Sequence, residues 1–129
     1  MRILTTFSFF LLSTMAVAAQ DIVCTVKSGG QGFMSPVIVF GLPAADQQPY
    51  VFDAVIEMAK GAPMVAKVKS RGGTVLRYRW RVSNIPARPS PATVGYWADL
   101  DTSNMTVKVS GTIRGFDNDI KGRGNCEKR

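Results

Sequence analysis

The stretch TVLRYRWRV, residues 74–82, alternates apolar or aromatic side chains with arginines from position to position. This alternation predicts a half-buried β-strand, because successive side chains of a strand point to opposite faces of its sheet. The inner face would carry Leu76, Tyr78, Trp80 and Val82, and the outer face Arg77, Arg79 and Arg81. The segment therefore predicts a sheet with one apolar side and one strongly cationic side.

The same period of two recurs along most of the chain, and clusters of Gly, Pro, Asp, Asn and Ser separate the periodic segments. Such spacing is typical of all-β folds with short connections. The predicted strands are 22–27, 36–40, 50–59, 64–70, 74–82, 92–98, 105–114 and 120–126. We expect a single antiparallel domain over residues 20–129, either a small β-sandwich or a barrel of about eight strands.

The loop before residue 74 sets the register of the hairpin that it closes. A two-residue loop would place cations opposite apolar residues, because a slip by one residue exchanges the two faces. A three-residue loop over 71–73 instead places Val68 opposite Leu76 and Lys67 opposite Arg77. The three-residue loop is therefore the predicted connection.

Residues 53–60, DAVIEMAK, fit two structures. A short helix would gather Val55, Ile56 and Ala59 on one face, together with the preceding phenylalanine. A strand followed by a three-residue loop would place Ile56 opposite Val68 and acidic residues opposite basic ones. These matched pairs favour the strand.

The acids nearest in sequence to the cationic hairpin are Asp53 and Glu57. In the strand register they lie opposite Arg71 and Lys67. They would therefore screen those two cations and leave Arg79 and Arg81 without a carboxylate.

The only two cysteines, Cys24 and Cys126, lie near the ends of the predicted domain. An even number of cysteines in an exported chain predicts a disulfide, here one that joins the terminal strands. Closing a loop of roughly 100 residues stabilises a fold by up to about 4 to 5 kcal/mol in the chain-entropy model. Gly122 and Gly124 share a face with Cys126, so another backbone could approach that face closely.

The sequence begins MRILTTFSFFLLSTMAVAAQ, with one arginine, an apolar run and then small residues. This order predicts a cleaved signal peptide over residues 1–19 and a periplasmic or secreted protein. The residues before Cys24 do not fit a lipid-attachment site, and no later segment is apolar enough to span a membrane.

Basic residues outnumber acidic ones, with 16 Lys and Arg against 9 Asp and Glu and no histidine. Guanidinium groups bind phosphate and carboxylate in bidentate fashion. The predicted anion-binding residues are Lys67, Lys69, Arg77, Arg79 and Arg81. Suitable partners are an anionic envelope component, such as lipid headgroups or lipopolysaccharide, or an acidic protein. The alternative is an ordinary solvated strand, or an edge strand whose charge prevents pairing with another chain.

Several other functions find little support in the sequence. Nucleic acid is disfavoured because the aromatic residues that would stack on bases face away from the arginines. Histidine-based triads and histidine or thiolate metal sites are excluded by composition. DNDIKG at 117–122 resembles the start of a calcium loop but has lysines at two ligand positions. Asp99 and Asp101 are spaced to share one strand face, as a catalytic acid and base would, but turn-forming residues follow them directly and a structural role is favoured. We therefore expect a protein that is not an enzyme and has no cofactor or metal.

The leading hypothesis is a small exported binding or envelope-interaction protein with a basic strand face. One alternative is an inhibitor or accessory protein that binds a partner through the proline-rich loop IPARPSP, residues 85–91, because prolines reduce the entropy lost on docking. Another is a small barrel that carries an apolar ligand in its interior.

Overall fold

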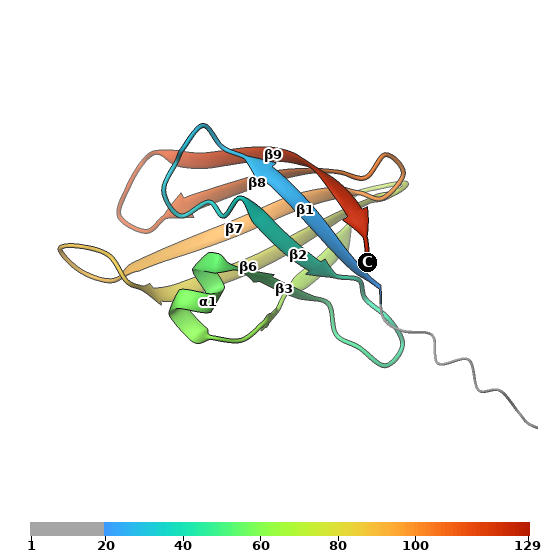
Figure 1. Cartoon of the computed structure of the whole chain (residues 1–129), viewed down its shortest axis with the longest axis horizontal. Coiled ribbons are helices and arrows are strands. Elements are labelled where there is room, and N and C mark those ends of the chain that lie inside the picture. The colour runs from blue at the N-terminus through green and yellow to red at the C-terminus, as the bar shows by residue number, and fades with distance from the viewer. Residues whose placement is uncertain (1–19) are drawn as a thin grey trace, which may run out of the picture.

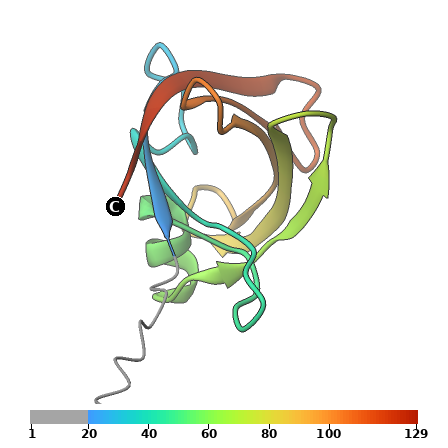
Figure 2. The same ribbon diagram turned by 90° about the vertical axis from the view of Figure 1, so that its right-hand side faces the viewer.

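The structure is a computed structural model that describes residues 20–129; the predicted signal peptide at 1–19 lies outside the described residues. It is mostly β, with one antiparallel sheet that is nearly closed into a barrel (Figures 1 and 2). The elements are β1 (Asp21–Lys27), β2 (Val37–Gly41), β3 (Tyr50–Asp53), α1 (Ala54–Lys60), β4 (Met64–Val65), β5 (Lys67–Ser70), β6 (Val75–Ile85), β7 (Ala92–Asp101), β8 (Thr106–Ile113) and β9 (Asp119–Lys128). The all-β prediction is confirmed. Of the two predicted architectures, the sheet takes the barrel form.

The strands follow one another around the barrel in chain order. The order across the sheet is β4-β3-β2-β1-β9-β8-β7-β6-β5, so that β1 pairs with β9 and the two edges are β4 and β5. Only Ala66 separates these two edge strands along the chain. The predicted strand 64–70 is therefore one extended segment that pairs with β3 at its start and with β6 at its end. This change of partner brings the two edges of the sheet together.

An aromatic cluster fills the interior beneath the cationic strand. Tyr78 and Trp80 pack edge-on against Phe40, with ring centroids 5.0 and 6.0 Å away, and Trp80 stacks on Tyr96 at 5.2 Å. The buried tyrosine hydroxyls donate hydrogen bonds to main-chain oxygens, Tyr78 to Gly41 at 2.9 Å and Tyr96 to Phe33 at 2.5 Å. The predicted inward direction of Tyr78 and Trp80 is confirmed.

The strand predicted over residues 50–59 is wrong in its second half, where the chain forms α1. Asp53 caps this helix, because its carboxylate accepts a hydrogen bond of 2.8 Å from the main-chain N–H of Ile56. Gly61 ends it in the left-handed conformation at φ 71°. Val55 and Ile56 are both buried, which a helix allows and a strand exposed on one face does not. The helix packs against β6 and β3 at one end of the barrel (Figure 1).

The predicted hairpin loop has the right length but begins one residue later than expected. Arg71 and Val75 are joined by a main-chain hydrogen bond of 2.9 Å, so the three loop residues are 72–74. Gly72 and Gly73 both have positive φ, at 105° and 57°, and thus supply the left-handed conformations inside the loop. Val68 pairs with Tyr78 rather than with Leu76. A shift of two residues keeps each side chain on its predicted face.

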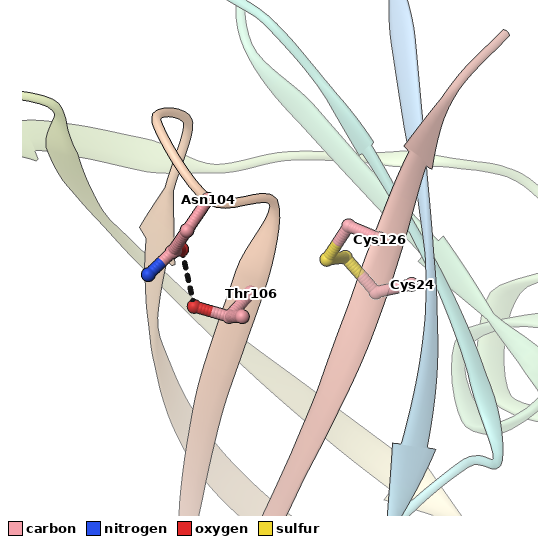
Figure 3. The surroundings of a disulfide bond; sticks show 4 residues. All are labelled: Cys24, Asn104, Thr106 and Cys126. Atoms are coloured by element: carbon pink, nitrogen blue, oxygen red, sulfur yellow. Dashed lines mark hydrogen bonds between the residues drawn. A yellow bond between two sulfur atoms is a disulfide. The ribbon is translucent and has the colours of Figure 1, made fainter.

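The seam between β1 and β9 carries the predicted disulfide (Figure 3). Cys24 and Cys126 lie directly opposite each other, with Cα atoms 4.0 Å apart, and both are buried. Beside them Thr106 donates a hydrogen bond of 2.6 Å to Asn104 (Figure 3). The disulfide between Cys24 and Cys126 is compatible with an oxidising location. Among residues 20–129, no helix has the length and apolar character needed to cross a membrane.

Candidate functional site: a basic face on the barrel

The five predicted anion-binding residues lie together on the outside of the barrel. Lys67 pairs directly with Arg79, and Lys69 pairs directly with Arg77, across β5 and β6. Arg81 continues the row of arginines along β6. All five point outward; Arg77 is half-buried and the other four are exposed.

Arg77 is already engaged by a carboxylate that the sequence analysis did not assign to it. Its Nε and Nη2 atoms donate hydrogen bonds of 2.7 and 2.8 Å to the two carboxylate oxygens of Asp99 on β7. Its guanidinium group also lies 4.4 Å from the ring centroid of Trp97. The hydrogen bonds from Arg77 hold the pKa of Asp99 below its ordinary value. Arg77 is therefore less available to a ligand than its neighbours.

Asp53 and Glu57, expected to screen Lys67 and Arg71, lie elsewhere. Asp53 is buried at the start of α1, where loss of water raises the pKa of its carboxyl group. Glu57 lies in the first turn of the same helix. Within residues 20–129 the one ion pair is between Arg77 and Asp99, so Arg79 and Arg81 have no carboxylate partner there.

Three further cations extend this surface around the barrel. The register places Asp99 opposite Lys108 on β8, Lys108 opposite Arg123 on β9, and Arg123 opposite Lys27 on β1. With Lys69, Arg77 and Asp99 they form one row across six strands, in which Asp99 of β7 is the one acidic member. The three added cations line a groove of about 450 Å³ together with Thr25, Thr106 and Asn125.

A second row begins at Lys67 and Arg79 and reaches Lys121 on β9 by way of Trp97 and Ser110. We call the cations of these rows, with Arg81, the basic face. Its members are Lys27, Lys67, Lys69, Arg77, Arg79, Arg81, Lys108, Lys121 and Arg123.

Asp99 and Asp101, the two carboxylates spaced as a possible catalytic acid and base, are both bound by other residues of the fold. Asp101 accepts hydrogen bonds from Thr74, at 2.9 Å, and from the main chain and hydroxyl of Ser103, at 3.0 and 2.6 Å. These bonds, above all those from Ser103, lower the pKa of Asp101 and fix the turn after β7. Asp99 is bound to Arg77. In the described part of the chain, no three Asp, Glu, Cys or His side chains gather closely enough to hold a metal ion.

Replacing Asp99 by asparagine should lower the free energy of unfolding by about 1 kcal/mol at neutral pH, as expected for a partly exposed bidentate ion pair. The pKa of Asp99 is lowered in the folded state, so its contribution is present above the ordinary carboxyl pKa of about 4 and is lost as the pH falls through the lowered value. Urea unfolding of both proteins across the acidic range would measure this. Asp117→Asn, in the exposed 114–118 loop, is the control. A deficit for Asp99→Asn that is constant at every pH would contradict the ion-pair explanation.

Comparison of the chain with protein-family models, with curated proteins and with solved structures finds no match. Geometry and charge are therefore the basis for inferring its function.

Proposed function

We propose that this is a small exported, non-enzymatic binding protein that holds an anionic partner on its basic face. One observation carries the proposal. Four pairs of cations stand directly opposite each other across neighbouring strands: Lys67 with Arg79, Lys69 with Arg77, Lys108 with Arg123, and Arg123 with Lys27. Like charges in this position destabilise a sheet. An anionic partner bound between these cations would screen their repulsion and would be attracted by both of them.

The spacing of these cations suits a surface with many negative charges. Neighbouring strands lie about 4.8 Å apart, and residues on one face of a strand recur about every 6.8 Å. Within β5–β6, and within β8–β9–β1, neighbouring cations of the basic face therefore lie about 5 to 7 Å apart, and β7, which carries Asp99 and Trp97 there, separates the two groups. Closely spaced phosphate groups, as in anionic lipid headgroups or lipopolysaccharide, match this spacing better than a single small anion does. The barrel is convex, so a flat anionic surface would touch only part of the face at one time.

Export is part of the proposal. Its support is the predicted signal peptide at 1–19 and the disulfide between Cys24 and Cys126, which is compatible with an oxidising compartment. Periplasmic or secreted proteins meet envelope lipids directly.

Charge reversal on the basic face should abolish binding to anionic vesicles. Each cation near such a surface contributes about 1 kcal/mol, so the double variant Arg79→Glu/Arg81→Glu should bind at least roughly thirtyfold more weakly. Lys108→Glu/Arg123→Glu should have a similar effect from the far side of the face. The measurement is co-sedimentation with vesicles of phosphatidylcholine and phosphatidylglycerol at low salt, with pure phosphatidylcholine as the reference.

A control variant separates the basic face from net charge alone. Lys60→Glu/Arg129→Glu changes the charge equally, at the end of α1 and beyond β9, and should leave binding within about twofold of the unmodified protein. Equal losses in the control and the basic-face variants would show a non-specific charge effect. Retention unchanged by either basic-face variant would refute the proposal.

A further inference from the structure

Gly95, in the middle of β7, is the strand glycine that the fold does not explain. At the other strand glycines, an ideal Cβ atom would lie within 3 Å of a neighbouring atom: 2.1 Å at Gly41, 2.8 Å at Gly111, 2.5 Å at Gly122 and 1.8 Å at Gly124. At Gly95 nothing lies within 4 Å, and its φ is outside the left-handed region. Glycine within a strand destabilises a fold relative to alanine, because it loses more conformational freedom on folding. A ligand that approaches the main chain closely would account for that cost.

The space over Gly95 is a groove of about 440 Å³ with an arginine on each side. It is lined by Arg81 of β6, Thr93 and Gly95 of β7, and Thr112 and Arg114 on the β8 side. Arg81 and Thr112 are the direct cross-strand neighbours of Gly95. The main-chain N–H of Arg114 donates to the carbonyl of Thr93 at 2.9 Å, which places Arg114 one row further along.

The charge in this groove is positive. Within the described residues, neither Arg81 nor Arg114 forms an ion pair. One carboxylate lies beside the groove, that of Asp119, which accepts a hydrogen bond of 3.1 Å from Thr112. Two guanidinium groups beside an exposed stretch of main chain are suited to an oxyanion, since each can donate two parallel hydrogen bonds.

A cleft of about 550 Å³, mostly apolar but also lined by Arg88 and Ser90, adjoins the groove and shares Thr93 and Arg114 with it. Its walls come from the loops that connect β1 to β2, β6 to β7 and β8 to β9, at the same end of the barrel as α1 (Figure 1). The larger apolar side chains in these walls are Phe33, Pro89, Pro91, Ile113 and Phe116. Phe116 is 67% exposed and lies beside the other apolar side chains of these walls.

We propose that the groove and the cleft form one binding site for an amphiphilic anion, a single apolar chain that ends in a phosphate or carboxylate. The oxyanion lies over Gly95 between Arg81 and Arg114, and the chain lies in the cleft against Phe116. Each volume falls in the range of small-molecule sites. This inference deepens the proposed function, on which it rests through Arg81 of the basic face. The ligand lies at the end of the barrel, because the aromatic cluster occupies the interior.

Dodecyl phosphate and laurate, used below the concentrations at which they form micelles, should bind in isothermal titration calorimetry. Inorganic phosphate and dodecanol each carry half of the ligand and should bind at least tenfold more weakly. Binding of dodecyl phosphate no tighter than of inorganic phosphate would show a site for the anion alone and would overturn the proposal. Binding of dodecanol as tight as that of dodecyl phosphate would equally overturn it.

Two substitutions test the two halves of the site. Gly95→Gln fills the groove and should weaken the binding of dodecyl phosphate at least tenfold. Phe116→Ser removes an apolar wall of the cleft, whose contact with the ligand contributes about 1.5 kcal/mol. It should therefore weaken the binding of dodecyl phosphate about tenfold without changing the binding of inorganic phosphate. The matched controls are Gly32→Gln, at another glycine with open space, and Met58→Ser, at an exposed apolar residue of α1. Affinities unchanged by the two site variants, or lowered equally by the controls, would overturn the proposal.

Retention on anionic vesicles tests the proposed function of the basic face separately from the amphiphile site. Gly95→Gln and Phe116→Ser keep every cation of the basic face, so their retention on phosphatidylglycerol vesicles should stay within about twofold of the unmodified protein. Loss of dodecyl phosphate binding with normal vesicle retention would support the site and leave the basic face intact. If the unmodified protein binds dodecyl phosphate but is not retained on anionic vesicles, the amphiphile site is supported and the proposed function of the basic face is rejected.

Discussion

Replacing Gly124 by alanine should lower the free energy of unfolding by about 3 kcal/mol or more, near the upper end of the costs measured for overpacked interiors. An ideal Cβ atom at this position would lie 1.8 Å from the carbonyl oxygen of Thr25 and 2.7 Å from its carbonyl carbon. Both are main-chain atoms of β1, so no side-chain rotation can relieve the contact. The two strands would have to separate along the seam that closes the barrel. Urea unfolding followed by circular dichroism measures the loss.

Gly95→Ala is the matched control, because it makes the same chemical change in a strand with no atom near the new methyl group. It should leave the stability unchanged or raise it by up to about 1 kcal/mol, since alanine restricts the unfolded chain more than glycine does. Equal destabilisation by the two substitutions would mean that the close approach at Gly124 is not the cause.

Removal of the disulfide should cost about 4 kcal/mol. The bond joins residues separated by 102 positions, and the chain-entropy model gives about 4.7 kcal/mol for a loop of this size. Cys24 and Cys126 are buried within the same β1–β9 seam, so the two alanines of Cys24→Ala/Cys126→Ala would also reduce packing there. Chemical unfolding of the double variant and of the unmodified protein measures the difference.

Reduction of the unmodified protein provides the control for packing. Treatment with a thiol reductant should produce most of the same loss, whereas the double alanine variant should not respond to the reductant. A reduced protein that keeps the stability of the oxidised one would show that the cross-link contributes little and that the remaining β1–β9 contacts are sufficient.

Most of the fold could be predicted because its signals are local. The alternation in residues 75–82 needs only neighbouring residues, and it correctly places Tyr78 and Trp80 inside and Arg79 outside. The pairing of the terminal strands followed from two cysteines and the glycines beside Cys126, and the structure confirms it. The choice between sandwich and barrel depends on contacts between distant segments, which periodicity does not report.

For residues 54–60 the matched strand pairs favour a strand over the helix, even though the signals of the helix are in the sequence. Asp53 is a favourable N-cap, and Gly61 with the nearby Pro63 is a common way to end a helix. The strand register matched apolar with apolar and acid with base residues, and that match outweighed the capping signals. Burial of the adjacent residues Val55 and Ile56 decides for the helix, and burial is a property of the fold.

The candidate site was predicted only where its residues lie in one hairpin. Lys108, Arg123 and Lys27 join Arg77 because the barrel places β6, β7, β8, β9 and β1 in sequence around its wall. Asp99 could have been found from strand parity, once β7 was known to pair with β6. Gly95 could not, since the empty space above it becomes visible only from the positions of its neighbours.

The pairing of β1 with β9 has a consequence for the timing of assembly. Every other pairing joins segments that are close along the chain, so those hairpins can form one after another as the polypeptide emerges. The amino-terminal strand must wait for its second neighbour until residues 119–128 have been made. Among the strand pairings, that of β1 with β9 closes the longest loop and so has the largest entropy cost of closure, and the ring of strands cannot close before β9 is present.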